Sequence, residues 1–72
     1  MSKIPAFKPI EIIKILKKAG FKLVRQKGSH QIYLKNNRAV TIPYHNRDLR
    51  KGTLNAIIKQ SGLTLKEFLN LK

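Results

Sequence analysis

The chain of 72 residues contains no cysteine and no tryptophan. Without cysteine it has neither a disulfide framework nor a thiolate zinc site. Two histidines and three scattered acidic residues, Glu11, Asp48 and Glu67, make a poor set of metal ligands. Paired carboxylates and glycine-rich phosphate loops are also missing, which argues against two-metal nucleases and nucleotide-binding loops. We therefore expect no metal centre and no cofactor.

Long hydrophobic runs are missing as well. No apolar stretch approaches the length that spans a bilayer, and no secretion signal is visible, so we expect a cytoplasmic protein without a membrane role. A chain this short predicts a single domain whose core contributes roughly 3–5 kcal/mol of stability. We expect residues 1–8 to form an N-terminal extension and residues 9–71 to form the folded core.

Negative charge is scarce. Sixteen Lys and Arg residues stand against three Asp and Glu residues, which gives a formal net charge of +13. Solubility of a small domain needs a net charge of magnitude about 2–8, so this excess indicates an anionic partner. Nucleic acid fits best because phosphate neutralises Lys and Arg, and an acidic protein is the other candidate.

The spacing of apolar residues predicts three helices. The predicted ranges are Pro9 to Ala19, which Gly20 follows, about Gly52 to Gly62, and Thr64 to about Leu71. Residues that favour helix starts and stops lie at the ends of each range. Between the first two helices, alternating residues predict three strands: Lys22–Gln26, His30–Lys35 and Ala39–Pro43. The turns between them are predicted at Lys27-Gly28-Ser29 and Asn36-Asn37-Arg38. This order predicts an α+β fold, a three-stranded antiparallel sheet with its helices packed on one face.

His30 is the residue best suited to chemistry. An imidazole can accept a proton from a ribose 2′-OH or donate one to a leaving oxygen near neutral pH. We expect Ile32 and Leu34 to face the core, and alternation then places His30 on the same side. Tyr33 lies on the opposite side, where it could stack on a base or simply cover the sheet. His30 can then act only if the strand end projects past the helices. The alternative is a histidine with a purely structural role.

Other polar residues surround this candidate in sequence. The cations expected to bind RNA are Arg25, Lys27, Arg47, Arg50 and Lys51. The last three lie just before the second helix, whose N-terminus favours phosphate, and the alternative is that they lie in a solvated loop. His45 follows Pro43, and pairing of the second and third strands could bring it near His30. Lys27, Ser29 and His45 are therefore possible auxiliary residues, although a solvent-facing loop histidine is the simpler interpretation of His45. Ser29 does not form a nucleophile pair with His30, because successive strand residues point to opposite faces.

Several segments together resemble the HicA family of toxin mRNA interferases. They are Ala19-Gly20-Phe21, Arg25-Gln26-Lys27-Gly28-Ser29-His30, Val40-Thr41-Ile42-Pro43 with His45, Lys51-Gly52-Thr53-Leu54 and Ile57-Ile58-Lys59-Gln60-Ser61-Gly62-Leu63. The resemblance runs from about Pro9 to Phe68. Gly-Ser-His alone would be a weak signal, whereas the ordered set is specific.

The resemblance implies a double-stranded-RNA-binding-domain-like fold and the toxin of a type II toxin–antitoxin system. It also implies metal-independent endoribonuclease activity on mRNA, with His30 as the catalytic histidine, and neutralisation by a cognate HicB-type antitoxin. A non-catalytic RNA-binding module of the same fold stays open as an alternative, since such domains read RNA shape through basic residues. A basic structural protein of a ribonucleoprotein particle is a third.

Overall fold

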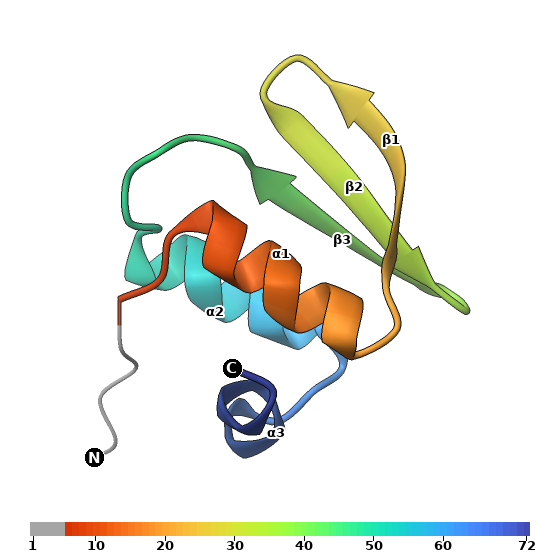
Figure 1. Ribbon diagram of the computed structural model, residues 1–72, viewed down its shortest axis with the longest axis vertical. Helices are drawn as coiled ribbons and strands as arrows, with labels where there is room; N and C mark the ends of the chain where they lie inside the picture. Colours follow the sequence, from red (N-terminus) through yellow and green to blue (C-terminus); the bar gives the residue numbers. More distant parts are fainter. Residues whose placement is uncertain (1–5) are drawn as a thin grey trace.

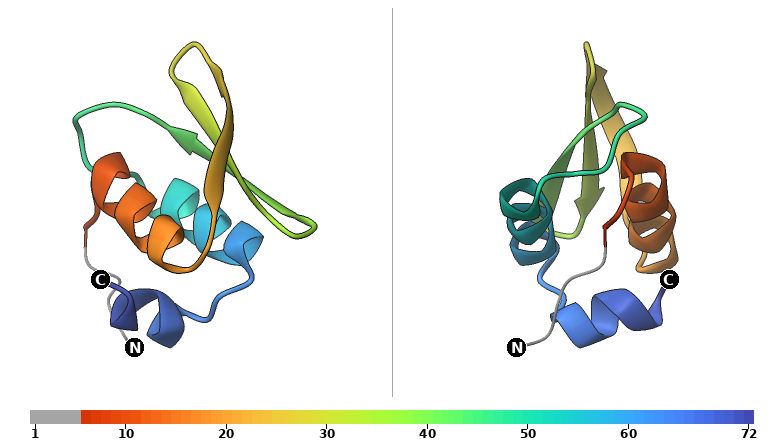
Figure 2. Two further views of the ribbon diagram at one scale, coloured as in Figure 1. Left: turned by 45° about the vertical axis from the view of Figure 1, so that its right-hand side comes forward. Right: turned by 90° about the vertical axis from the view of Figure 1, so that its left-hand side faces the viewer.

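Figure 1 shows the computed structural model, which describes residues 6–72. The elements are α1 (Pro9–Lys18), β1 (Lys22–Lys27), β2 (His30–Lys35), β3 (Arg38–Pro43), α2 (Lys51–Ser61) and α3 (Leu65–Asn70). The strands form one antiparallel sheet in the order β1-β2-β3. Helices α1 and α2 lie side by side against one face of the sheet, and α3 lies beyond them (Figures 1 and 2). The predicted α+β, double-stranded-RNA-binding-domain-like layout is confirmed.

The core lies between the helices and the sheet. Its buried apolar residues come from every element except β1. Phe7 is fully buried, and its carbonyl accepts a hydrogen bond of 2.8 Å from the Leu49 backbone N–H. The Phe7 ring therefore packs with the core, two residues before α1 begins at Pro9. Residues 1–5 lie outside the described residues.

The helix ends follow the predicted signals. Gly20 and Gly62 adopt φ angles of +103° and +76°, the left-handed conformation that ends a helix. After Gly20, the Phe21 N–H donates to the Leu16 carbonyl at 2.9 Å, and the Phe21 ring enters the core. The capping box of α3 is also present. Hydrogen bonds from the Thr64 backbone and side chain hold the pKa of Glu67 below its usual value.

Two cations of the β2–β3 hairpin lie at the C-terminal ends of the helices. Lys35 and Arg38 are direct cross-strand partners, an arrangement that by itself is unfavourable for like charges. The Lys35 Nζ donates to the carbonyl of Ala19, the C-cap residue of α1, at 2.6 Å. The Arg38 guanidinium packs against Gly62 so closely that a Cβ atom there would clash with it. Both helix ends carry partial negative charge, which offsets the repulsion between the two cations.

Both hairpin turns are one residue shorter than expected. Lys27 pairs with His30 across the first turn, and Lys35 pairs with Arg38 across the second, so each turn has two central residues. This difference reverses the faces of β2, because a shift of one residue moves every side chain to the other side of a strand. Tyr33 is 2 % exposed and lies in the core, whereas Leu34 is 40 % exposed. The expectation that Ile32 and Leu34 face the core is wrong.

The two edges of the sheet differ. At the β3 edge, the Thr41 backbone N–H donates to the Gln60 side-chain oxygen of α2 at 3.2 Å. Every residue of β1 is exposed, and its pairing with β2 shifts register between Leu23 and Arg25. Such a bulge and the basic side chains of β1 discourage pairing with further strands. Among residues 6–72, no helix has the length and apolar character needed to cross a membrane.

Candidate active site

His30 lies on the face of the sheet that the helices leave open. The register places Lys27 of β1 and Pro43 of β3 directly opposite it, and partners in an antiparallel ladder project from the same face. His30 is exposed. Tyr33, three residues further along β2, points to the opposite face and is buried on the helix side. The reversed faces of β2 therefore remove the main obstacle to a catalytic His30, which is burial in the core.

The end of the sheet that carries His30 projects past the helices. Figures 1 and 2 show the β1–β2 turn extending beyond α1 and α2 into open space. Gly28 takes a φ of +59° in this turn, and no atom lies near enough to touch a Cβ there. We call this region the His30 end, defined by Lys27, His30 and Pro43. It satisfies the requirement that a polymer be able to reach the imidazole.

Arg25 lies on the same open face. It pairs with Ile32 of β2, the residue that follows His30 on this face. Arg25 is therefore a diagonal neighbour of His30. Diagonal neighbours across a ladder are within reach of a long side chain. Lys27 and Arg25 can therefore place their charges beside an anion held at His30. The structure brings together three of the predicted site residues, Arg25, Lys27 and His30.

Tyr33 does not belong to this surface. Its ring is buried against the helices, and its hydroxyl donates to the Gln31 side-chain oxygen at 2.7 Å. Burial raises the pKa of Tyr33, and the neighbouring Tyr44 raises it further. The prediction that Tyr33 stacks on RNA is wrong, because the ring fills the space between sheet and helices in place of the two aliphatic side chains expected there.

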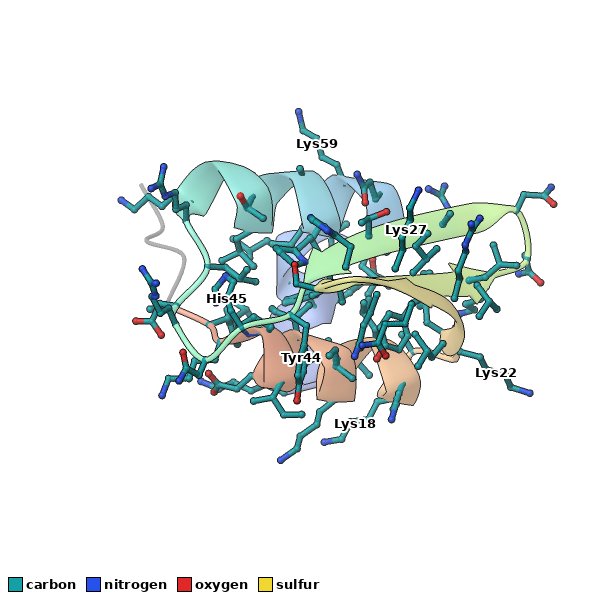
Figure 3. All side chains as sticks on the ribbon, turned by 90° about the horizontal axis from the view of Figure 1, so that it is seen from above. Lys18, Lys22, Lys27, Tyr44, His45 and Lys59 are labelled. Carbon is teal, nitrogen blue, oxygen red and sulfur yellow. The ribbon has the colours of Figure 1, made fainter. Side chains whose placement is uncertain are left out.

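His45 lies on the connector between β3 and α2. Its Nδ1 accepts a hydrogen bond of 3.1 Å from the Arg47 backbone N–H. Together with Arg47 and Arg50 it lines a cavity of about 310 Å³, which Asp48 also lines. In the view of Figure 3, His45 lies on the connector, between α1 and α2. Its hydrogen-bond partner is thus the Arg47 backbone, and its proximity to His30 stays a prediction.

Ser29 contributes its backbone to the site. Its carbonyl accepts a hydrogen bond of 2.6 Å from the Tyr44 N–H, which extends the β2–β3 ladder one pair beyond His30 and Pro43. Tyr44 was not among the predicted site residues, yet it is 44 % exposed and adjoins the His30 end. Counting the β2–β3 register from a two-residue turn would have found it, since that register places Tyr44 opposite Ser29.

Comparison with known proteins identifies the family. The family model for the HicA toxin of bacterial toxin–antitoxin systems matches residues 11–63. The chain belongs to the HicA toxin family. Comparison with curated protein sequences finds no match. As a HicA toxin, the protein is one component of a toxin–antitoxin system, and its family implies an antitoxin partner.

Positively charged side chains of this HicA toxin lie on several sides of the described residues. Figure 3 shows Lys18 of α1, Lys22 of β1 and Lys59 of α2 pointing outward on different sides. Lys51, predicted to bind RNA, is exposed as the first residue of α2. The distribution of charge therefore does not locate the candidate active site, which is defined by the position of His30. Among the described residues, no group of three or more His, Cys, Asp or Glu side chains gathers as metal ligands would.

Proposed function

We propose that this HicA toxin is a metal-independent endoribonuclease that cleaves mRNA with His30 as its proton-transfer group. The observation that supports this is the exposed His30 at the projecting end of the open sheet face, with Lys27 directly opposite. An imidazole so placed is accessible to a flexible polymer and keeps a cation within reach of the same phosphate.

The chemistry follows from these positions. His30 accepts the proton of a ribose 2′-OH, the 2′-oxygen attacks the adjacent phosphorus, and the bond to the 5′-oxygen breaks as that oxygen takes up a proton from solvent. Lys27 and Arg25 stabilise the negative charge that develops on the phosphoryl oxygens. The product is a 2′,3′-cyclic phosphate, or the 3′-phosphate formed from it by water.

The remaining predicted cations extend the RNA contact. Arg47 and Arg50 line the cavity on the connector, and Lys51 follows at the start of α2. The connector follows Pro43, the residue directly opposite His30, so a strand of RNA can follow it from the site of cleavage to these cations. We assign phosphate binding to these residues and an auxiliary role to Ser29 and His45.

His30→Ala tests the mechanism. General-base catalysis contributes about 10²–10⁴-fold, so cleavage of a labelled transcript in the presence of EDTA should fall by at least about 100-fold. Binding of a 2′-O-methyl RNA, which lacks the attacking hydroxyl, should be unchanged. Lys59→Gln, on the outer side of α2, is the matched control and should cleave at the wild-type rate.

Retained cleavage by highly purified His30→Ala protein would refute the role of His30. Binding without cleavage by the wild-type protein would favour the non-catalytic RNA-binding module instead.

We further propose that the antitoxin is an acidic protein of the HicB type that covers the open face around His30. A net charge of +13 favours rapid association with an acidic partner, and occupation of this face would exclude RNA. Titration with the antitoxin should suppress RNA binding and cleavage in parallel. Continued RNA binding by the saturated complex would contradict this arrangement.

A further inference from the structure

The aromatic residues divide into four buried rings and one exposed ring. All five lie within residues 6–72, and Phe7, Phe21, Tyr33 and Phe68 are at most 2 % exposed. Tyr44 is 44 % exposed. The core therefore uses four of the aromatic rings, and Tyr44 is the one that a ligand can contact without disturbing the packing.

The backbone fixes Tyr44 next to the proposed site of cleavage. Its N–H donates to the Ser29 carbonyl at 2.6 Å, and Ser29 immediately precedes His30. On its other side, Tyr44 follows Pro43, the cross-strand partner of His30. Directly opposed residues of an antiparallel ladder have Cβ atoms about 4.5–5.5 Å apart. Tyr44 is opposite Ser29, so it lies one residue pair beyond His30 and Pro43.

The ring and the imidazole point to opposite sides of the sheet. Alternation from Ile42, which is buried on the helix side, places Tyr44 on that side too, and Figure 3 shows it extending over α1. Beyond Tyr44 the connector continues to the cavity lined by Arg47 and Arg50. Along the chain, Tyr44 thus lies between Pro43, the partner of His30, and the cations of the connector.

We propose that Tyr44 stacks on an unpaired base next to the phosphodiester held at His30, so that the RNA is single-stranded where it is cut. The proposal rests on the proposed RNA-cleaving function and adds its substrate class. A strand that passes over the end of the sheet presents a phosphate to His30, a base to Tyr44 and further phosphates to the connector. A base in an A-form duplex is covered by its neighbours and offers no free face to the ring.

Intrinsic fluorescence tests this contact directly. The chain has no tryptophan and two tyrosines, so Tyr33→Phe leaves Tyr44 as the sole emitter and Tyr44→Phe leaves Tyr33. Single-stranded 2′-O-methyl RNA should quench the Tyr33→Phe protein and leave the Tyr44→Phe protein unquenched. Circular dichroism of both variants checks that each is folded.

Matched ligands separate stacking from charge attraction. An abasic strand of equal length carries the same phosphates without bases, and the duplex form of the same sequence carries stacked bases. Neither should quench Tyr44. Quenching by the abasic strand or the duplex as strong as that by the single strand would overturn the proposal, as would quenching of Tyr44 by an acidic protein but not by RNA.

Affinity provides a second measurement. Loss of one stacking contact weakens binding of single-stranded RNA by roughly 5- to 150-fold, so Tyr44→Leu should fall within this range. Tyr44→Phe keeps the ring and should retain wild-type affinity. Reduced affinity of this variant would mean that the hydroxyl, and not the ring, makes the contact. Wild-type affinity of Tyr44→Leu would refute the contact.

The outcomes distinguish this proposal from the proposed function. The 2′-O-methyl RNA cannot be cleaved, so stacking is measured independently of catalysis. Quenching without cleavage of natural RNA by the wild-type protein would support Tyr44 and refute the ribonuclease. Cleavage without quenching would support the ribonuclease and refute Tyr44.

Discussion

The two faces of β2 differ in burial. On the face toward the helices, Tyr33 packs beside Val40 and Ile42 and is closed to solvent. On the open face, His30 and Leu34 are exposed and Ile32 is half-buried. Alternation lets one strand of six residues contribute to the core and to the proposed site at once. The comparison teaches that burial in this sheet follows the register, since the face with more aliphatic residues on β2 is the one left open.

The largest predicted effect is a difference in the free energy of unfolding between substitutions on the two faces of β2. Tyr33→Ala removes a buried aromatic ring and should lower the free energy of unfolding by about 3–5 kcal/mol, which approaches the total stability of a domain this small. Leu34→Ala should cost about 1 kcal/mol or less because the side chain is partly exposed. Urea denaturation of both variants measures the difference. Similar losses for the two would contradict the assignment of faces.

Salt dependence shows which surfaces contact RNA. Removing two phosphate contacts should reduce the slope of log affinity against log salt by about 1.4 for a single strand. We expect this for Arg25→Gln with Lys27→Gln on the open face, and for Arg50→Gln with Lys51→Gln at the connector. The matched control is Lys18→Gln with Lys59→Gln, which removes equal charge from the outer sides of α1 and α2.

An unchanged slope for either test pair would remove that surface from the RNA contact. A slope reduced equally by the control pair would mean that RNA binds the positive charge of the whole molecule without a defined path.

A smaller effect should appear at alkaline pH. The pKa of Tyr33 is raised in the folded state, so above about pH 10 the unfolded chain loses this proton before the folded chain does. The free energy of unfolding should therefore fall as pH rises from the unfolded pKa through the folded one. Tyr33→Phe is the control, because the lysines titrate in both proteins. An equal alkaline loss in both would show that the Tyr33 phenol does not contribute to it.

Much of the fold could be predicted from the sequence. Gly20, Gly62 and the Thr64–Glu67 capping box act through local geometry, so they mark the helix ends without knowledge of the tertiary structure. The buried face of α2, with Leu54, Ile57 and Ile58, follows from helical spacing. The family was equally visible, because its motifs are ordered along the chain.

The faces of the sheet were less predictable. A three-residue turn at Asn36-Asn37-Arg38 places Ile32 and Leu34 opposite Ile42 and Val40, and that arrangement buries aliphatic residues on both strands. In the structure Arg38 joins β3 and pairs with Lys35, which sets Tyr33 against Val40 instead. Contacts of Lys35 with Ala19 and of Arg38 with Gly62 accompany this register, and both join the hairpin to helix ends distant in sequence.

The sequence by itself therefore determined the elements, the charge, the family and His30 as the candidate, since these depend on local conformation and composition. The tertiary structure decided that His30 is exposed, that Tyr33 is buried and that Tyr44 lies beside the proposed site. The reason is physical: the face of a strand depends on its pairing partners and on which side the helices cover. A turn shorter by one residue exchanges the two faces.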